Sequence, residues 1–289
     1  VPSGLNRQGQ RIAAVFAVAA GDVLFTSGGT EAANLAVLGL GEPALPVALA
    51  PVEHPAVFEA AQQRGVVLWQ VDGEGRARIE RPAREVGLLC LVHAQSELGT
   101  LQPTAEVAAL AEHLRVPWLV DAAQTLGRVP LGELFARGAI VALSPHKAGG
   151  LRGHGVLLGH ELTARLRPLL RGGAQEFGLR PGTQSPGLAA ANALAIELAV
   201  AEQPERARAM LAARSNFLGG LASTAVEHRV LTPLGPSLPN TVMVHFARVD
   251  GRNLVPTLDL AGVHASHGSA CSSGAPTPPR VLTAIGLDD

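Results

Sequence analysis

Two kinds of apolar pattern alternate along the chain. Short runs rich in valine, isoleucine and leucine are separated by longer segments in which alanine and leucine are mixed with charged residues. The first pattern is typical of buried strands and the second of helices, so their alternation predicts strand–helix units around a mostly parallel sheet. The predicted strands are residues 23–26, 46–50, 66–71, 87–93, 117–121, 139–144 and 155–159. The predicted helices among them are 30–40, 56–64, 103–114 and 161–170.

The pattern changes near residue 200. The longest helical segment, 188–201, is followed by Pro204 and a polar helix at 205–221, after which proline, glycine and serine become dense. Strands at 241–246 and 263–266 flank a helix at 251–260, which predicts a small α+β unit. We therefore expect an α/β protein with a large domain at 1–200, a sheet sandwiched by helices, and a smaller C-terminal domain at 201–289.

Composition narrows the class of protein. The 289 residues are 47% hydrophobic and 16% charged, which predicts a compact globule. The net charge of −1 gives no reason to expect nucleic acid or an anionic membrane surface as a partner. No apolar run reaches the roughly 20 residues of a membrane-spanning helix, no start resembles a signal peptide, and two cysteines are too few for a disulfide framework. We expect a cytoplasmic protein that binds small molecules or proteins.

Lys147 is the only lysine, and the other basic residues are all arginine. Arginine replaces lysine readily at a solvated surface, but its guanidinium stays protonated and cannot act as an amine nucleophile or base. The single lysine is therefore a candidate for chemistry, with chance as the alternative.

Three segments at strand ends carry candidate chemistry. Small residues at the turn 27–31 would let backbone amides approach a phosphate at a helix start, although an ordinary capped turn has the same appearance. Asp121 ends a predicted strand, where it could hold a cationic ring nitrogen or cap a helix. Lys147 follows the next predicted strand. An amine, a carboxylate and a phosphate cup are the layout that a pyridoxal phosphate Schiff base requires.

Two further positions have open interpretations. His54 starts a predicted helix, where it could stack on a planar cofactor and relay protons, or cap the helix. Cys271 lies among glycines and serines in a predicted exposed loop, where its thiol could be a nucleophile, whereas Cys90 lies in an apolar run and is expected in the core. A metal site of His264, His267 and Cys271 lacks the usual fourth ligand, so we expect no metal.

Eight motifs in order along the chain resemble the cysteine desulfurases of the NifS/IscS type, which are pyridoxal phosphate enzymes of fold type I. They are TSGGTEA at 26–32, VEH at 52–54, DAAQ at 121–124, SPHK at 144–147, GGAQE at 172–176, LRPGT at 179–183, LPNT at 238–241 and GSACSSG at 268–274. The last motif resembles the first class of the family, which has a long cysteine loop.

The resemblance implies a role for each matching residue. Lys147 would form the Schiff base with pyridoxal 5'-phosphate, Asp121 would bind the ring nitrogen, Gln124 the ring hydroxyl, and His54 would stack on the ring and carry protons. Cys271 would accept the sulfur of L-cysteine as a persulfide. The phosphate would be held by Gly29, Thr30, Ser144 and His146 and, from the neighbouring subunit of a homodimer, Thr183.

Two departures from the family pattern concern the substrate. Where the family has two adjacent asparagines, this chain has Gln95 and Ser96, so Ser96 is our candidate for the altered contact. The 289 residues do not include the C-terminal arginine that pairs with the substrate carboxylate in the family. Either that arginine lies in a tail absent from this sequence or another residue substitutes for it, with Arg180 as the candidate.

The sequence leaves three functions open. The first is a cysteine desulfurase that passes sulfur to an acceptor or scaffold protein for iron–sulfur cluster assembly or tRNA thiolation. The alternatives are a selenocysteine or C–S lyase on the same scaffold and a degenerate paralogue that binds the cofactor without turnover.

Overall fold

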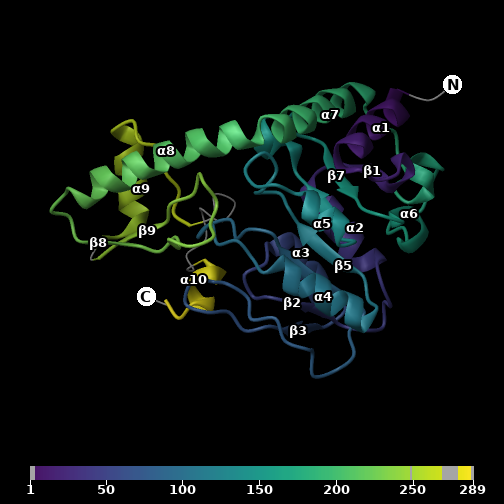
Figure 1. The fold of residues 1–289 in the computed structure, drawn as a ribbon, viewed down its shortest axis with the longest axis horizontal. Coiled ribbons are helices and arrows are strands. Elements are labelled where there is room, and N and C mark those ends of the chain that lie inside the picture. Colours follow the sequence, from purple (N-terminus) through teal and green to yellow (C-terminus); the bar gives the residue numbers. More distant parts are fainter. Residues whose placement is uncertain (1–3, 248, 269–278, 288–289) are drawn as a thin grey trace.

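The computed structural model describes residues 4–247, 249–268 and 279–287. Figure 1 shows a large unit built on one sheet and, at its far side, a smaller group of elements reached through a long helix. The elements of the large unit are α1 (Gly4–Phe16), β1 (Val23–Thr26), α2 (Gly29–Gly39), β2 (Val47–Leu49), α3 (Pro55–Gln62), β3 (Val66–Leu68), β4 (Leu88–Val92), α4 (Thr104–Leu114), β5 (Trp118–Asp121), α5 (Gly132–Ala136), β6 (Ile140–Leu143), β7 (Gly155–Leu158), α6 (Leu162–Arg165) and α7 (Pro186–Ala201).

The central sheet has seven strands in the order β1-β7-β6-β5-β4-β2-β3. Every pairing from β6 to β3 is parallel, and only β7 runs antiparallel to its neighbours β6 and β1. The predicted α/β fold with a mostly parallel sheet is confirmed. Because β1 and β6 are both antiparallel to β7, β1 has the same direction as the parallel strands.

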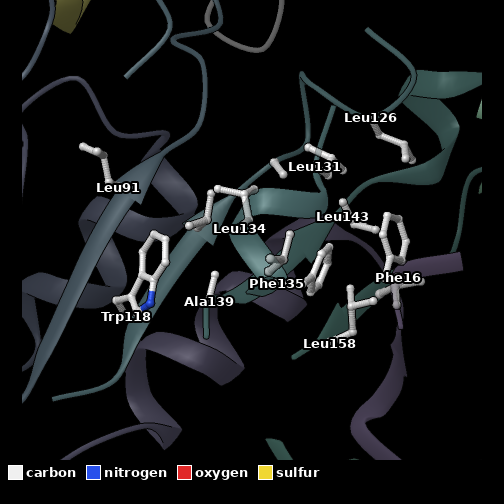
Figure 2. Close-up of a cluster of buried hydrophobic side chains, with 14 of the residues drawn as sticks. Phe16, Leu91, Trp118, Leu126, Leu131, Leu134, Phe135, Ala139, Leu143 and Leu158 are labelled. Carbon is white, nitrogen blue, oxygen red and sulfur yellow. The ribbon is translucent and has the colours of Figure 1, made fainter. Parts of the chain in front are cut away.

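Helices cover both faces of the sheet. Successive strand residues point to opposite faces, so Phe25 belongs to one buried cluster and Leu24 to the other. Helices α1, α4, α5 and α7 contribute to the first cluster, and α2, α3 and α6 to the second. Figure 2 shows part of the first cluster, where the Phe16 and Phe135 rings lie near each other with centroids 4.7 Å apart. Burial on both faces explains why the strands are continuous apolar runs.

Six strands end at one edge of the sheet, and five of the loops that follow them carry candidate site residues. The segments after β1, β2, β4, β5 and β6 all leave from the carboxyl ends of strands that point the same way. These segments begin at residues 27, 50, 93, 122 and 144. In open α/β sheets this edge is where ligands bind, so the fold brings together motifs that are far apart in the sequence.

Two predicted elements are wrong. The helix predicted at 161–170 is only α6, because Pro168 cannot continue a helix and Leu166 is already extended, with φ −91° and ψ 135°. The strand predicted at 263–266 is irregular chain, since the small sheet of the described residues pairs only β8 (His228–Val230) with β9 (Val244–Phe246). Helices α1, α5 and α10 (Arg280–Ala284) and strand β8 were not predicted.

The C-terminal part leaves the large unit through α8 (Gln203–Ala222), which follows α7 after the single residue Glu202. Figure 1 shows β8, β9 and α9 (Gly251–Leu260) grouped at the far end of α8, while α10 (Arg280–Ala284) returns to the large unit. Val281 of α10 is buried there, and Arg280 pairs with Glu59 of α3 at 2.7 Å. The division into domains at 1–200 and 201–289 stays a prediction. Among the described residues, no helix has the length and apolar character needed to cross a bilayer.

Candidate active site

The start of α2 and the turn after β6 approach each other closely and form a candidate phosphate site, which we call the cradle. Gly28 is the N-cap of α2, and no side chain caps this helix. A Cβ atom on Gly29 would overlap the Ser144 hydroxyl, and one on Gly155 would overlap the Gly28 backbone. The first amides of a helix have no partner within the helix. Together with the hydroxyls of Thr30 and Ser144, they form a donor set that suits a phosphate.

The cradle gives a direct test of the need for glycine. We expect Gly29→Ala to weaken binding of pyridoxal 5'-phosphate by about tenfold to a hundredfold, because the added methyl group must displace Ser144. Titration of the apoprotein with the cofactor measures the loss. Gly187→Ala, where an added Cβ meets nothing within 4 Å, is the matched control and should bind normally. Equal affinity of the two variants would contradict this account of the cradle.

Lys147 lies on a tight 3₁₀ turn, Pro145–Ala148, directly after β6. Its amide donates to the Ser144 carbonyl at 3.0 Å, and Gly149 ends the turn with φ +101°. The Lys147 side chain is half-buried and His146 is exposed. Partial burial lowers the pKa of His146, and the charges of Lys147 and Arg152 lower it further. The imidazole is therefore mainly neutral near pH 7.

Asp121 ends β5 and faces the same edge. Its Oδ1 accepts a hydrogen bond from the amide of Ala123 at 2.9 Å, which opens the turn that carries Gln124. The side-chain amide of Gln124 has no hydrogen-bond partner among the described residues, while its carbonyl accepts from Arg128 at 2.6 Å. One carboxylate oxygen of Asp121 and the Gln124 amide thus remain to bind a ligand.

His54 is the N-cap of α3. Its Nδ1 accepts from the amide of Ala56 at 3.1 Å, so the neutral ring carries its proton on Nε2. Burial lowers the pKa of His54, Asp121 raises it and Lys147 lowers it. The Ala56 hydrogen bond confirms the capping interpretation. The charges of Asp121 and Lys147 both act on His54, which indicates that the three side chains lie near one another.

Sequence reasoning missed the role of Glu53, which precedes His54. The side chain is buried, its Oε1 accepts from the amide of Val92 at 2.6 Å, and its Oε2 has no partner. Burial raises the pKa of Glu53 to about 8, although the Val92 hydrogen bond lowers it, and the charge of Asp121 adds to the increase. Val92 pairs with Asp121 across β4 and β5, so a largely protonated carboxyl lies beside the Asp121 carboxylate near pH 7. Its position inside the VEH motif was the available signal.

Thr183 and Arg180 lie on a segment that is fixed to β1 and α2. Arg180 donates to Glu31 through Nε at 2.6 Å and Nη2 at 3.1 Å. Burial by itself raises the pKa of Glu31, but hydrogen bonds from Arg180 and Ser27 outweigh it and hold that pKa below its ordinary value. Thr183 is exposed. A substrate carboxylate would have to share Arg180 with Glu31, and the roles of Arg180 and Thr183 stay predictions.

The remaining predicted residues have different outcomes. Gln95 is buried and its Oε1 accepts from the amides of Glu97 and Leu98, whereas Ser96 is half-exposed after β4. Gln95 is thus a turn residue, and the role of Ser96 stays a prediction. Cys90 is in the core, as expected. Cys271 lies outside the described residues.

Two of the three residues of the metal alternative, His264 and His267, are described by the structure and have other contacts. His264 contacts Asp259 at 3.0 Å in an exposed pair, and the His267 ring packs against Gly251. Residues 4–247, 249–268 and 279–287 contain no group of three or more side chains that could hold a metal ion.

Comparisons with known proteins give the family. The aminotransferase class-V family matches residues 4–283. The chain is 31% identical over 291 residues to the cysteine desulfurase IscS of Dictyoglomus turgidum, which covers 96% of this chain and 74% of that protein. It is 32% identical over 278 residues to the cysteine desulfurase NifS of Azotobacter vinelandii, covering 92% of this chain and 69% of that one.

Solved structures agree with this match. A NifS-like protein superposes with a TM-score of 0.83 at 29% identity, over 99% of this chain and 78% of that one. DndA from Streptomyces lividans superposes with a TM-score of 0.81 at 30% identity, over 98% and 84%. The phosphate cradle, the lysine turn and the strand-end aspartate fit pyridoxal 5'-phosphate, the cofactor of these enzymes. The chain belongs to the cysteine desulfurase family of class-V aminotransferases, whose members depend on pyridoxal phosphate.

Proposed function

We propose that the protein converts L-cysteine to L-alanine and transfers the sulfur to Cys271. The observation that carries this proposal is that Lys147, Asp121 and His54 lie near one another beside the phosphate cradle, at the edge where six strands end. The family match supports the same reaction, and the lyase and the inactive paralogue are not favoured.

Each residue of the site has a task that its position supports. Gly29, Thr30, Ser144, His146 and, in a dimer, Thr183 of the partner subunit would hold the phosphate. The Asp121 carboxylate would bind the protonated ring nitrogen of the cofactor. Gln124 would donate to the ring hydroxyl, and the His54 imidazole would stack on the ring. The bound cofactor supplies an electron sink for the substrate carbon next to the amino group.

Lys147 and His54 would carry the protons. Lys147 is held on a rigid turn, so its amine can remove the proton from the substrate Cα when it is neutral. The Nε2 proton of His54 is directed away from the helix amide that Nδ1 caps, which leaves it for transfer. Ser96 and Arg180 remain our candidates for the substrate carboxylate.

The sulfur step has a simple balance. The Cys271 thiolate attacks the substrate sulfur, an S–S bond forms and the Cβ–S bond breaks. The electron pair stays on the carbon fragment, which is protonated and released as alanine, while Cys271 keeps the sulfur as a persulfide. An acceptor or scaffold protein would then take this sulfur for iron–sulfur cluster assembly or tRNA thiolation, in the cytoplasm.

The test is a mass measurement after reaction with L-cysteine. The holoenzyme is incubated with a small excess of L-cysteine, alanine is quantified, and the peptide with Cys271 is examined for one added sulfur atom. We expect alanine and the persulfide together. In Cys271→Ala, alanine formation should fall at least about tenfold. Undiminished turnover in that variant would support the C–S lyase instead, and cofactor binding without any alanine would support the inactive paralogue.

We further propose that the protein is a homodimer. Leu169, Leu170 and Phe177 are exposed by 42%, 57% and 63%, and they share one segment with Thr183. Glu176 and Phe177 both have positive φ, 47° and 60°, which is unfavourable for L residues. The Glu176 carboxylate holds this conformation by accepting from the amide of Phe25 at 2.9 Å. The apolar residues are thus fixed where a second copy can cover them.

We expect Phe177→Arg to shift the protein toward monomer, because the added charge would be buried at the interface. Sedimentation velocity at a fixed concentration measures the change, expected to be at least about tenfold in the dimer dissociation constant. Val226→Arg, at an exposed apolar residue of the C-terminal part, is the control and should not alter association. A Phe177→Arg protein that remains fully dimeric would place the interface elsewhere.

A further inference from the structure

Arg128 holds the two segments that carry Lys147 and Gln124. Its Nη1 donates to the carbonyl of Gln124 at 2.6 Å, and its Nη2 donates to the carbonyl of Lys147 at 2.8 Å. The two acceptors belong to separate loops, one after β5 and the other after β6. One planar guanidinium therefore joins the backbone segment of Gln124, the predicted contact of the cofactor ring, to that of Lys147, which carries the predicted amine.

The surroundings of Arg128 favour a fixed side chain. Its Nε is buried without a partner, and burial together with the charge of Arg206 lowers its pKa. Its own carbonyl accepts from Gln203 at 3.0 Å, at the start of α8. Gly127 has φ +73°, and a Cβ there would press on Ala199 of α7. The guanidinium of this half-buried arginine thus has a buried donor without a partner, while its two other nitrogens are held by the carbonyls of Gln124 and Lys147.

A second arginine completes the contact with the lysine turn. Arg206 of α8 donates through Nη1 to the carbonyl of Ala148 at 3.1 Å, and Glu202 orients it by pairing with Nη2 at 2.8 Å. The carbonyls of Lys147 and Ala148 end the 3₁₀ turn, where they have no partner within the turn. The Lys147 carbonyl accepts from Arg128 and the Ala148 carbonyl accepts from Arg206. The Arg206 contact links the turn to α8, the helix that leads to the C-terminal part.

We propose that Arg128 is a positioning residue, which sets the Lys147 amine relative to Gln124 so that both reach the same cofactor. This inference rests on the proposed function, since it assumes that Lys147 is the group that binds the cofactor. In this role Arg128 acts through the two carbonyls that it binds. Nothing in the motifs that identify the family assigns it a role.

The test measures attachment of pyridoxal 5'-phosphate to Lys147 and not turnover. Apoprotein is mixed with the cofactor, samples are reduced with borohydride at intervals, and the peptide with Lys147 is quantified by mass. Arg128→Gln should attach the cofactor about tenfold more slowly than the unmodified protein, because small displacements of a reacting group reduce rates steeply. Arg128→Lys keeps the charge but reaches one carbonyl only, so it should recover part of the rate.

The matched control is Arg214→Gln. Arg214 donates to the carbonyls of Leu238 and Pro233 at 2.9 and 3.1 Å, a similar fork in a part of the chain without predicted site residues. It should lower the melting temperature by a similar amount and leave the attachment rate unchanged. If Arg128→Gln does not fold, Arg128→Lys is compared with Arg214→Lys in the same way.

The outcomes separate the two proposals. An attachment rate of Arg128→Gln within threefold of that of Arg214→Gln would overturn the role of Arg128. If the unmodified protein carries no cofactor on the Lys147 peptide, the proposed function itself fails, and the role of Arg128 fails with it.

Discussion

Replacing Lys147 by alanine is expected to lower alanine formation from L-cysteine by at least about a thousandfold, the upper range for loss of a positioned acid–base group. The variant removes the only lysine, so no other side-chain amine of the chain can replace it. After borohydride reduction of this variant, no peptide should carry the cofactor on a lysine side chain, because none remains. Lys147→Arg should be equally inactive, because a guanidinium stays protonated and cannot serve as base or nucleophile.

The control for this experiment is non-covalent binding of the cofactor, because Lys147→Ala leaves the phosphate cradle intact. We expect the variant to bind pyridoxal 5'-phosphate reversibly and to keep its melting temperature within a few degrees, since Lys147 is half-buried and its backbone contacts remain. Turnover within tenfold of the unmodified enzyme would remove Lys147 from the mechanism.

The second large effect concerns Glu53 and the pH dependence of stability. The folded protein holds the Glu53 proton up to about pH 8, whereas the unfolded chain releases it near the ordinary value of 4.5. Between these values the unfolded state binds fewer protons, so Glu53 makes the free energy of unfolding decrease as the pH rises. At about 1.4 kcal/mol per pH unit, the total over this interval approaches about 5 kcal/mol, of which about 4 kcal/mol has accumulated at pH 8.

We expect Glu53→Gln to remove this dependence. At pH 5 the variant and the unmodified apoprotein should be similarly stable, because a glutamine resembles the protonated acid and can still accept from Val92. At pH 8 the variant should be more stable by about 4 kcal/mol. Urea unfolding of both proteins at the two pH values measures the difference. Glu59→Gln, at an exposed ion pair with Arg280, is the control and should show less than about 0.5 kcal/mol of change. A pH-independent difference for Glu53→Gln would show that its carboxyl is ionised in the folded state.

Much of the fold was predictable because burial on both faces makes the strands of a parallel sheet continuous apolar runs. All seven strands of the central sheet were predicted, and most bounds differ from the structure by one residue. The strand predicted at 66–71 ends early, since β3 is a half-exposed edge strand and residues 69–70 are irregular chain. Helix α1 escaped prediction because its buried residues, Gly9, Ile12, Ala13 and Phe16, begin only at its sixth position and include a glycine.

The part of the site that was predictable consists of residues whose type and place in the sequence indicate their chemistry. A single lysine, an aspartate at a strand end and a glycine-rich turn were visible in the sequence, and strand directions alone bring them to one edge. Glu53 and Arg128 were not predicted, because their importance depends on burial and on partners 39 and 19 residues away. No local pattern reveals such contacts.

The position of β1 has a consequence for biosynthesis. All four residues of β1 are buried in the folded protein. Because β1 is an edge strand, it pairs only with β7, and Thr26 therefore has no pairing partner until Gly155 has been synthesised. At translation rates of about 5–20 residues per second, this interval is on the order of ten seconds. During that time the nascent chain exposes an apolar strand whose partner strand has not yet left the ribosome. The protein is therefore a candidate for chaperone capture early in its synthesis, before the cradle at the end of β1 can exist.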